Sequence, residues 1–418
     1  MTKNTIQISM QTELALLEES VPSQRTVEIT LRPPAAVESG KRPRLNLALV
    51  LDRSGSMSGA KLEYAKQAAQ HLIDLLDEQD RVAVVAYDDK VTVVAESMEI
   101  TSKSRRLIKN KVQKIETGGS TNLGDGWLTG CKEVAANQVE GQLERTLLLT
   151  DGLANVGMVD LEELAVHARE LCGRGVSTST FGVGEDFNEH LLEAMSTAGG
   201  GLYHYIQSPE QIAQIFSREF SELAAVTARD VKITLEIPAG VSAQVLGAWR
   251  AETENGRMCI YIGAMQAARP QSIYVNLLTP PANSETGITL KAEVSGLGGG
   301  GEAYVDSAEI EFKYAHKKTV NKAVRDQGLL ERSSQVRVAE AVNESLKLER
   351  KGKRKEASRN LKIAMEAASP YMPAAQLEKY DQMSQRMEHG LEENDRKSAQ
   401  YSSYMARRSR DEDEQEKP

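Results

Sequence analysis

Residues 45–56 read LNLALVLDRSGS, an apolar run that ends in one carboxylate and two hydroxyls. A run with almost no polar residue is typical of a central strand in a parallel sheet, which is buried on both faces. Asp52, Ser54 and Ser56 occupy alternate positions, and Gly55 opens a turn that can direct all three side chains to one point. These hard oxygen ligands predict a site for Mg²⁺, Mn²⁺ or Ca²⁺, and not for zinc.

Two later segments supply a further hydroxyl and a second carboxylate for this site. Thr121 follows the glycine-rich loop 118–120, just before a helical pattern, and Asp151 follows an apolar strand that ends in Thr150. In an open α/β sheet, ligands bind beyond the carboxyl ends of the strands, and both aspartates lie at such ends. The predicted metal ligands are therefore Asp52, Ser54, Ser56, Thr121 and Asp151.

Each motif is weak by itself, because Asp-x-Ser-Gly-Ser is a common polar turn, Gly-Gly-Ser-Thr is often a helix N-cap and Thr-Asp-Gly is a turn. Together and in this order they resemble the metal-ion-dependent adhesion site of von Willebrand factor A domains, over roughly residues 42–226. The resemblance implies a metal-dependent, non-enzymatic protein-binding module with Mg²⁺ as the first candidate ion. It also implies a protein partner that presents an Asp or Glu carboxylate, and a threonine that bonds the metal chiefly in the partner-bound state. The flanking segments resemble cytoplasmic bacterial proteins of this family.

The fold class follows from hydrophobic periodicity. Residues 42–226 alternate strands and helices, which predicts a mostly parallel, doubly wound α/β sheet with 91–95 as an antiparallel edge strand. Residues 229–314 and two N-terminal stretches alternate with period two, which favours an antiparallel β-sandwich. We therefore expect the α/β domain to be inserted in a discontinuous sandwich built from residues 1–41 and 227–315.

The C-terminal part is charge-rich and helical. Residues 316–400 predict a helical region that contains a helical hairpin, with a third helix over 373–397. One hairpin is fewer than the repeats that a tetratricopeptide array needs, so an ordinary hairpin is the simpler interpretation. Residues 401–418 end in an acidic run and are predicted to form a disordered tail.

Composition indicates which classes of partner molecule and which cellular compartment suit this chain. The net charge is −9, from 51 basic and 60 acidic residues, which disfavours nucleic acid and anionic membranes as partners. No stretch resembles a signal peptide or approaches the ~18 apolar residues of a membrane-spanning helix. The three cysteines are scattered and odd in number, which predicts reduced thiols and the cytoplasm. A non-classical export route stays open.

A Mg²⁺-dependent hydrolase of the phosphatase kind is the alternative function. Such an enzyme also uses an aspartate after a buried strand, but it typically needs a second aspartate where this chain has Ser54. Lys61 lies nearby and is interpreted as surface charge, and the six histidines are interpreted as surface or boundary residues. A structural protein with an empty site is a further alternative. The favoured prediction is a cytoplasmic scaffold that binds a partner through Mg²⁺.

Overall fold

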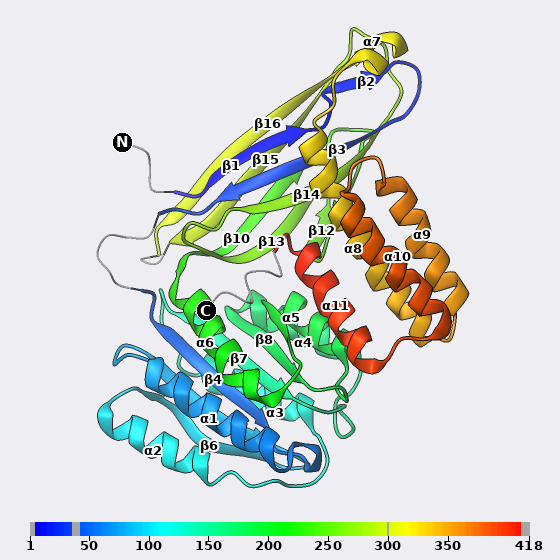
Figure 1. Ribbon diagram of the computed structural model, residues 1–418. Helices are drawn as coiled ribbons and strands as arrows, with labels where there is room; N and C mark the ends of the chain where they lie inside the picture. The colour runs from blue at the N-terminus through cyan, green and yellow to red at the C-terminus, as the bar shows by residue number, and fades with distance from the viewer. Residues whose placement is uncertain (1–4, 36–41, 299–300, 411–418) are drawn as a thin grey trace.

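A computed structural model describes residues 5–35, 42–298 and 301–410, arranged in three parts (Figure 1). An α/β domain lies at one end, a β-sandwich lies at the other, and a helical region packs beside both. The predicted acidic run 411–418 lies outside the described residues.

One six-stranded sheet forms the centre of the α/β domain, in the order β6-β5-β4-β7-β8-β9. Five strands run parallel and β6 is antiparallel to β5, as predicted for the edge. β4 is buried at all eight positions, which explains its continuous apolar run. The strands are β4 (Leu45–Asp52), β5 (Arg81–Tyr87), β6 (Val91–Glu99), β7 (Leu143–Thr150), β8 (Val176–Val183) and β9 (Gly200–Ile206).

Helices cover both faces of this sheet. Side chains of α1 (Ala60–Leu75), α2 (Ser102–Gln113) and α6 (Ile212–Ala224) share one apolar cluster with the sheet. Side chains of α3 (Leu123–Ala135), α4 (Leu161–Gly173) and α5 (Glu189–Ala198) share the other. The short 3₁₀ turns η1 (Gly55–Met57) and η2 (Pro209–Gln211) precede α1 and α6.

Glycines bring α3 close to the sheet. A Cβ at Gly130 would lie 2.3 Å from Val50 Cγ2, and one at Gly126 would lie 2.5 Å from Tyr87 Cγ. Both positions therefore require glycine for α3 to pack this tightly on β4 and β5. The loop before α3 carries Thr121, so this packing also fixes where that loop ends.

Two sheets form the sandwich, and the N-terminal strands belong to them. Their strands pair antiparallel, except that β2 runs parallel to β16. The sheets have the orders β1-β3-β14-β11 and β12-β13-β10-β15-β16-β2. β3 pairs with β14 over nine residues, so the α/β domain is inserted between strands of one sandwich, as the fold prediction states. The strands are β1 (Gln7–Thr12), β2 (Leu16–Glu18), β3 (Ser23–Arg32), β10 (Val226–Glu236), β11 (Ser242–Leu246), β12 (Arg250–Glu254), β13 (Arg257–Gln266), β14 (Gln271–Thr279), β15 (Gly287–Gly298) and β16 (Ala303–Ala315).

The helical region comprises α7 (Lys317–Lys322), α8 (Gln327–Arg350), α9 (Arg354–Ala368), α10 (Ala374–His389) and α11 (Glu393–Arg407). Helices α8 and α9 are consecutive and pack against each other, and α10 packs on α9. Within the described residues, no helix combines the length and apolarity needed to cross a membrane.

Two C-terminal predictions were wrong. The helix predicted over 373–397 is two helices, because Gly390 adopts φ +101° and ends α10. The tail predicted from residue 401 begins too early, because α11 continues to Arg407. Tyr401, Tyr404 and Met405 are buried and complete an apolar cluster of the α/β domain, which holds this helix in place.

Candidate metal centre

Asp52 is the innermost of the predicted ligands. It ends β4, is fully buried, and accepts hydrogen bonds from the Ser54 backbone N–H at Oδ1 (2.8 Å) and from Thr150 Oγ1 at Oδ2 (2.6 Å). Burial raises the pKa of the Asp52 carboxyl, although these hydrogen bonds act in the opposite direction. No cationic side chain of the described residues pairs with it, so the carboxylate would gain from a nearby cation.

Ser54, Ser56 and Asp151 continue the site outward. The Oγ atoms of Ser54 and Ser56 lie 3.2 Å apart, and Ser56 Oγ donates to Asp151 Oδ1 at 2.7 Å. Asp151 and Ser54 are buried, whereas Ser56 is exposed. The oxygen cluster therefore opens to solvent on the Ser56 side.

Backbone hydrogen bonds hold the 52–56 turn against the 118–121 loop. Gly118 N–H donates to Arg53 O at 2.7 Å, and Gly55 N–H donates to Gly119 O at 2.9 Å. A Cβ at Gly118 would lie 1.5 Å from Asp88 Oδ2, so this loop position admits only glycine while Asp88 stays in place. Burial works against ionisation of Asp88, but hydrogen bonds from Lys90 and the charge of Arg53 outweigh it and lower its pKa. Asp88 therefore positions this loop.

Thr121 lies beside the same cluster. It is 4% exposed, its N–H donates to Asn155 Oδ1 at 2.8 Å, and its carbonyl accepts from Asn155 N–H at 3.1 Å. A Cβ at Gly152 would lie 3.4 Å from Ser56 Oγ and 3.7 Å from Thr121 Oγ1. The two hydroxyls thus flank one small space, which a methyl group at Gly152 would fill.

Lys61 is the member of this cluster that the sequence interpretation missed. Its Nζ lies 2.5 Å from Asp151 Oδ2, and it was interpreted as ordinary surface charge. Lys61 belongs to the first turn of α1, nine residues after Asp52, and nothing local in the sequence indicates that its ammonium group reaches Asp151. The contact gives one of the two aspartates a cationic partner.

His204 also departs from the prediction of surface or boundary histidines. It is 2% exposed, its Nε2 lies 2.9 Å from Glu219 Oε2, and its ring stacks on Phe181. Arg145 pairs with the same carboxylate at 3.0 Å. These groups fasten α6 to the sheet and lie apart from the predicted metal ligands.

The donor set fits a hard cation. Three hydroxyls and two carboxylates come from three segments, and such oxygens suit Mg²⁺ more than zinc. No group of three or more His, Cys, Asp or Glu side chains gathers as a metal cluster in the part of the chain that the structure describes. The fit therefore depends on the hydroxyls as well as on Asp52 and Asp151.

This fold and oxygen cluster define the class of the α/β domain. Residues 46–218 match the family model of the von Willebrand factor type A domain, and the domain is a von Willebrand factor type A (VWA) domain. The chain is 31% identical to the uncharacterized protein sll0103 of Synechocystis sp. over 215 residues. The aligned residues make up 51% of this chain and 50% of that protein. It is 30% identical to human inter-alpha-trypsin inhibitor heavy chain H3 over 163 residues. The aligned residues make up 38% of this chain and 18% of that protein. The chain thus spans half or less of the length of these relatives.

Solved structures share the whole arrangement. The von Willebrand factor type A protein from Catenulispora acidiphila superposes with a TM-score of 0.77 over 96% of this chain and 98% of that one, at 18% identity. The ArnB paralog VWA2 from Sulfolobus acidocaldarius superposes with a TM-score of 0.64 over 97% of this chain and 98% of that one, at 17% identity. At these identities the likeness concerns the fold alone, and it extends through the sandwich and the helical region.

Proposed function

We propose that this chain is a non-enzymatic protein-binding module whose VWA domain recognises its partner through a divalent cation, with Mg²⁺ as the first candidate. The observation that supports the proposal is the convergence of Asp52, Ser54, Ser56, Thr121 and Asp151 at the carboxyl ends of β4 and β7. VWA domains are typically protein-interaction modules. The bound cation would supply an electrophilic contact for an oxygen ligand from outside.

The kind of partner follows from the charge of the site. Asp52 is buried with both oxygens hydrogen-bonded, and Lys61 already neutralises part of Asp151. The three neutral hydroxyls add no negative charge, so a divalent cation here would keep part of its charge. An Asp or Glu side chain of a protein partner is the ligand that suits such a cation. The exposed side of the cluster, at Ser56, gives that side chain access.

The hydrolase alternative fits this geometry less well. An aspartate that accepts a phosphoryl group needs one free oxygen that faces the substrate. Asp52 is 0% exposed, and Ser54 N–H and Thr150 Oγ1 occupy its two oxygens. We therefore propose no phosphoryl transfer at this site.

We propose the cytoplasm as the compartment, on the state of the cysteines. Cys131, Cys172 and Cys259 are all free thiols, and burial raises the pKa of Cys131 to about 12. Unpaired cysteines are typical of reducing compartments.

A pull-down with the full chain as bait tests the function. Lysate partners should be recovered in Mg²⁺ and lost in EDTA, and Thr121→Ala should weaken partner recovery more than it weakens Mg²⁺ binding measured by calorimetry. A contact made mainly in the partner-bound state affects partner affinity most. Thr117→Ala is the matched control, because Thr117 is an exposed threonine of the same loop. Equal recovery in Mg²⁺ and EDTA would exclude the proposed role of the metal.

A further inference from the structure

A cleft of about 410 Å³ lies where the three parts of the chain meet. The VWA domain contributes α4 and α5, the sandwich contributes the segment that leads into β12, and the helical region contributes α8 and α11. Its volume lies within the ~300–1,000 Å³ of typical small-molecule sites, which occur preferentially at domain interfaces. We name it the junction cleft.

Positive charge dominates the junction cleft. Arg169 of α4, Arg250 of β12, Lys347 of α8 and Arg407 of α11 line it, and Glu193 of α5 is the carboxylate among the lining residues. Four cations and one carboxylate line it, and Glu252 and Glu344, which pair with Arg250 and Lys347, bring the net charge of the whole group to +1 at neutral pH. Burial lowers the pKa of the lining His190 and keeps that imidazole neutral. This charge departs from a chain whose overall charge is −9.

The cations differ in how far the protein satisfies them. Arg407 pairs with Glu193 at 2.9 Å. Lys347 pairs with Glu344 at 2.7 Å, both side chains are exposed, and such an exposed pair contributes little. Arg250 is held more firmly, because its side chain is 19% exposed, donates twice to Glu252 Oε1 and lies 3.8 Å from the Tyr261 ring centroid. Arg169 forms no hydrogen bond or ion pair within the described part of the chain. Arg169 and Lys347 are therefore the two cations most available to an anion.

Two polar atoms in the cleft wall make no hydrogen bond, although one of them, His190 Nε2, lies 3.9 Å from Glu189 Oε1. Thr197 Oγ1 and His190 Nε2 are buried and make no hydrogen bond with the residues that the structure describes. Buried polar atoms are nearly always satisfied, and an unsatisfied atom calls for a partner from outside the chain. Both belong to lining residues from α5.

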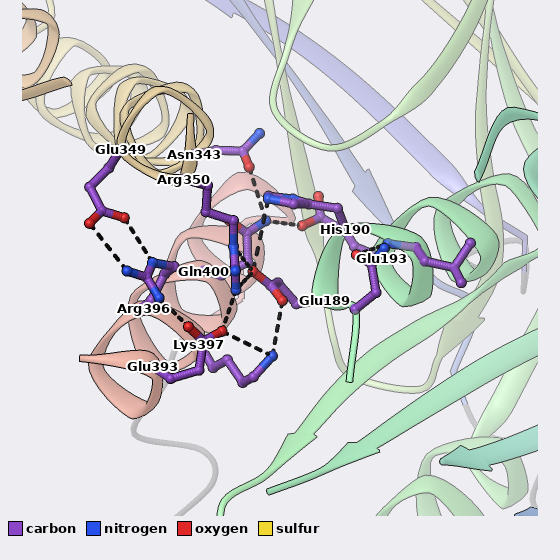
Figure 2. A network of polar contacts seen from close by, with 12 residues as sticks. Glu189, His190, Glu193, Asn343, Glu349, Arg350, Glu393, Arg396, Lys397 and Gln400 are labelled. Carbon is purple, nitrogen blue, oxygen red and sulfur yellow. Dashed lines mark hydrogen bonds and ion pairs between the residues drawn. The ribbon is translucent and has the colours of Figure 1, made fainter. Parts of the chain in front are cut away.

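A rigid polar network forms one wall of the cleft. Figure 2 shows α8 and α11 joined to α5, with Gln400 Nε2 donating to Asn343 Oδ1 at 2.9 Å and also bonding to Glu193. Deeper in the same network, Lys397 is fully buried and donates to Glu189 at 3.0 Å. The wall is thus held in position before any ligand arrives, which lowers the entropic cost of binding.

We propose that the junction cleft binds a small molecule that carries a phosphate group. Guanidinium groups match phosphate oxygens in a planar, two-pronged geometry, and charged hydrogen bonds of this kind are about twice as strong as neutral ones. Arg169 belongs to the VWA domain and Lys347 to the helical region, so a phosphate compound bound to both would bridge two parts of the chain. The site is separate from the predicted metal ligands, none of which lines it.

Calorimetry on the full chain in EDTA tests the proposal, because EDTA removes divalent cations and so excludes the metal centre from the measurement. The probes are inorganic pyrophosphate and ADP, with citrate as a polyanion that lacks phosphate. We expect both phosphate probes to bind and citrate to bind at least about tenfold more weakly. Arg169→Ala and Lys347→Ala should each weaken binding of the phosphate probes about tenfold.

Arg174→Ala is the matched control. Arg174 is the C-cap of α4, five residues after Arg169, and is not among the residues that line the cleft. This variant removes the same charge and should leave binding unchanged. The proposal is overturned if neither phosphate probe binds, if citrate binds equally well, or if Arg169→Ala and Lys347→Ala bind as tightly as Arg174→Ala. None of these outcomes bears on partner binding at the metal centre.

Discussion

Ser56 Oγ donates a hydrogen bond of 2.7 Å to Asp151 Oδ1, which ties the 52–56 turn to a strand end 95 residues later. This contact makes the oxygen cluster a property of the folded sheet and not of one local motif. The same carboxylate also contacts Lys61 through its other oxygen. Any cation bound here must therefore share Asp151 with a hydroxyl and an ammonium group, and this competition can be measured.

Gly152→Ala should weaken Mg²⁺ binding at least about tenfold without unfolding the protein. The added methyl would lie in ordinary contact with Ser56 Oγ and Thr121 Oγ1, at 3.4 and 3.7 Å, and would occupy the space between them. Calorimetric titration with Mg²⁺ measures the effect. Gly173→Ala is the control, since nothing lies within 4 Å of a Cβ there. Normal affinity in Gly152→Ala would place the cation elsewhere.

Lys61→Met should strengthen Mg²⁺ binding, on the order of tenfold at low ionic strength. The variant keeps most of the aliphatic stem but removes the ammonium group that contacts Asp151 Oδ2 at 2.5 Å. The same titration measures it, with Lys111→Met as a control on an exposed lysine of α2. Weaker binding in Lys61→Met would show instead that the lysine positions Asp151 for the metal.

Lys397→Met should destabilise the protein by about 1.5–3 kcal/mol, because it removes the buried cationic partner of Glu189 and leaves that carboxylate with the partly exposed Arg350 alone. Lys397 is fully buried, donates to Phe187 O at 2.6 Å and to Glu189 Oε2 at 3.0 Å, and lies 4.0 Å from the Phe187 ring centroid (Figure 2). Chemical denaturation gives the free energy of unfolding. Lys362→Met removes an exposed pair with Glu388 and should cost less than about 1 kcal/mol. Similar losses in both variants would refute the role given to burial.

Glu144 should make stability depend on pH near neutrality. Burial raises its pKa to about 7, from 4.5 in the unfolded chain. The folded state holds this proton more tightly, so the contribution is fully present below pH 4.5 and is lost as pH rises through 7. Glu144→Gln should therefore be more stable relative to wild type at about pH 8 than at about pH 5. Denaturation midpoints at both values test this, with exposed Glu140→Gln as the control, which should show no such difference.

The sequence predicts the fold well where periodicity and burial agree. The wholly buried run 45–52 and the alternating strands 229–314 have distinct periods, so the parallel sheet and the sandwich could be told apart. The sequence also contains a helix-end signal at Gly390 and a helical apolar spacing at Tyr401, Tyr404 and Met405. The many charged residues around them hid both patterns, so the prediction missed the helix end and the last helix.

Other features depend on distant contacts that no local pattern encodes. Lys61 reaches Asp151 across 90 positions, and Lys397 reaches Glu189 across 208. A lysine is ordinarily exposed, so its burial follows only from which carboxylate the fold brings beside it. The five predicted ligands were recognisable because a motif of oxygen ligands at strand ends repeats a known order, whereas these lysines belong to no such motif.

The pairing of β3 with β14 also sets the order in which parts of the chain can fold during translation. Thr30 and Ser272 lie opposite one another although 242 residues separate them. At about 5–20 residues per second, a ribosome completes the intervening segment on the order of ten seconds or more after β3 emerges. Val27, Ile29 and Leu31 are apolar strand residues that wait through that interval with β1 on one side and without β14 on the other. The nascent chain therefore assembles the inserted VWA domain first, then the sandwich, and last the helices that pack on both.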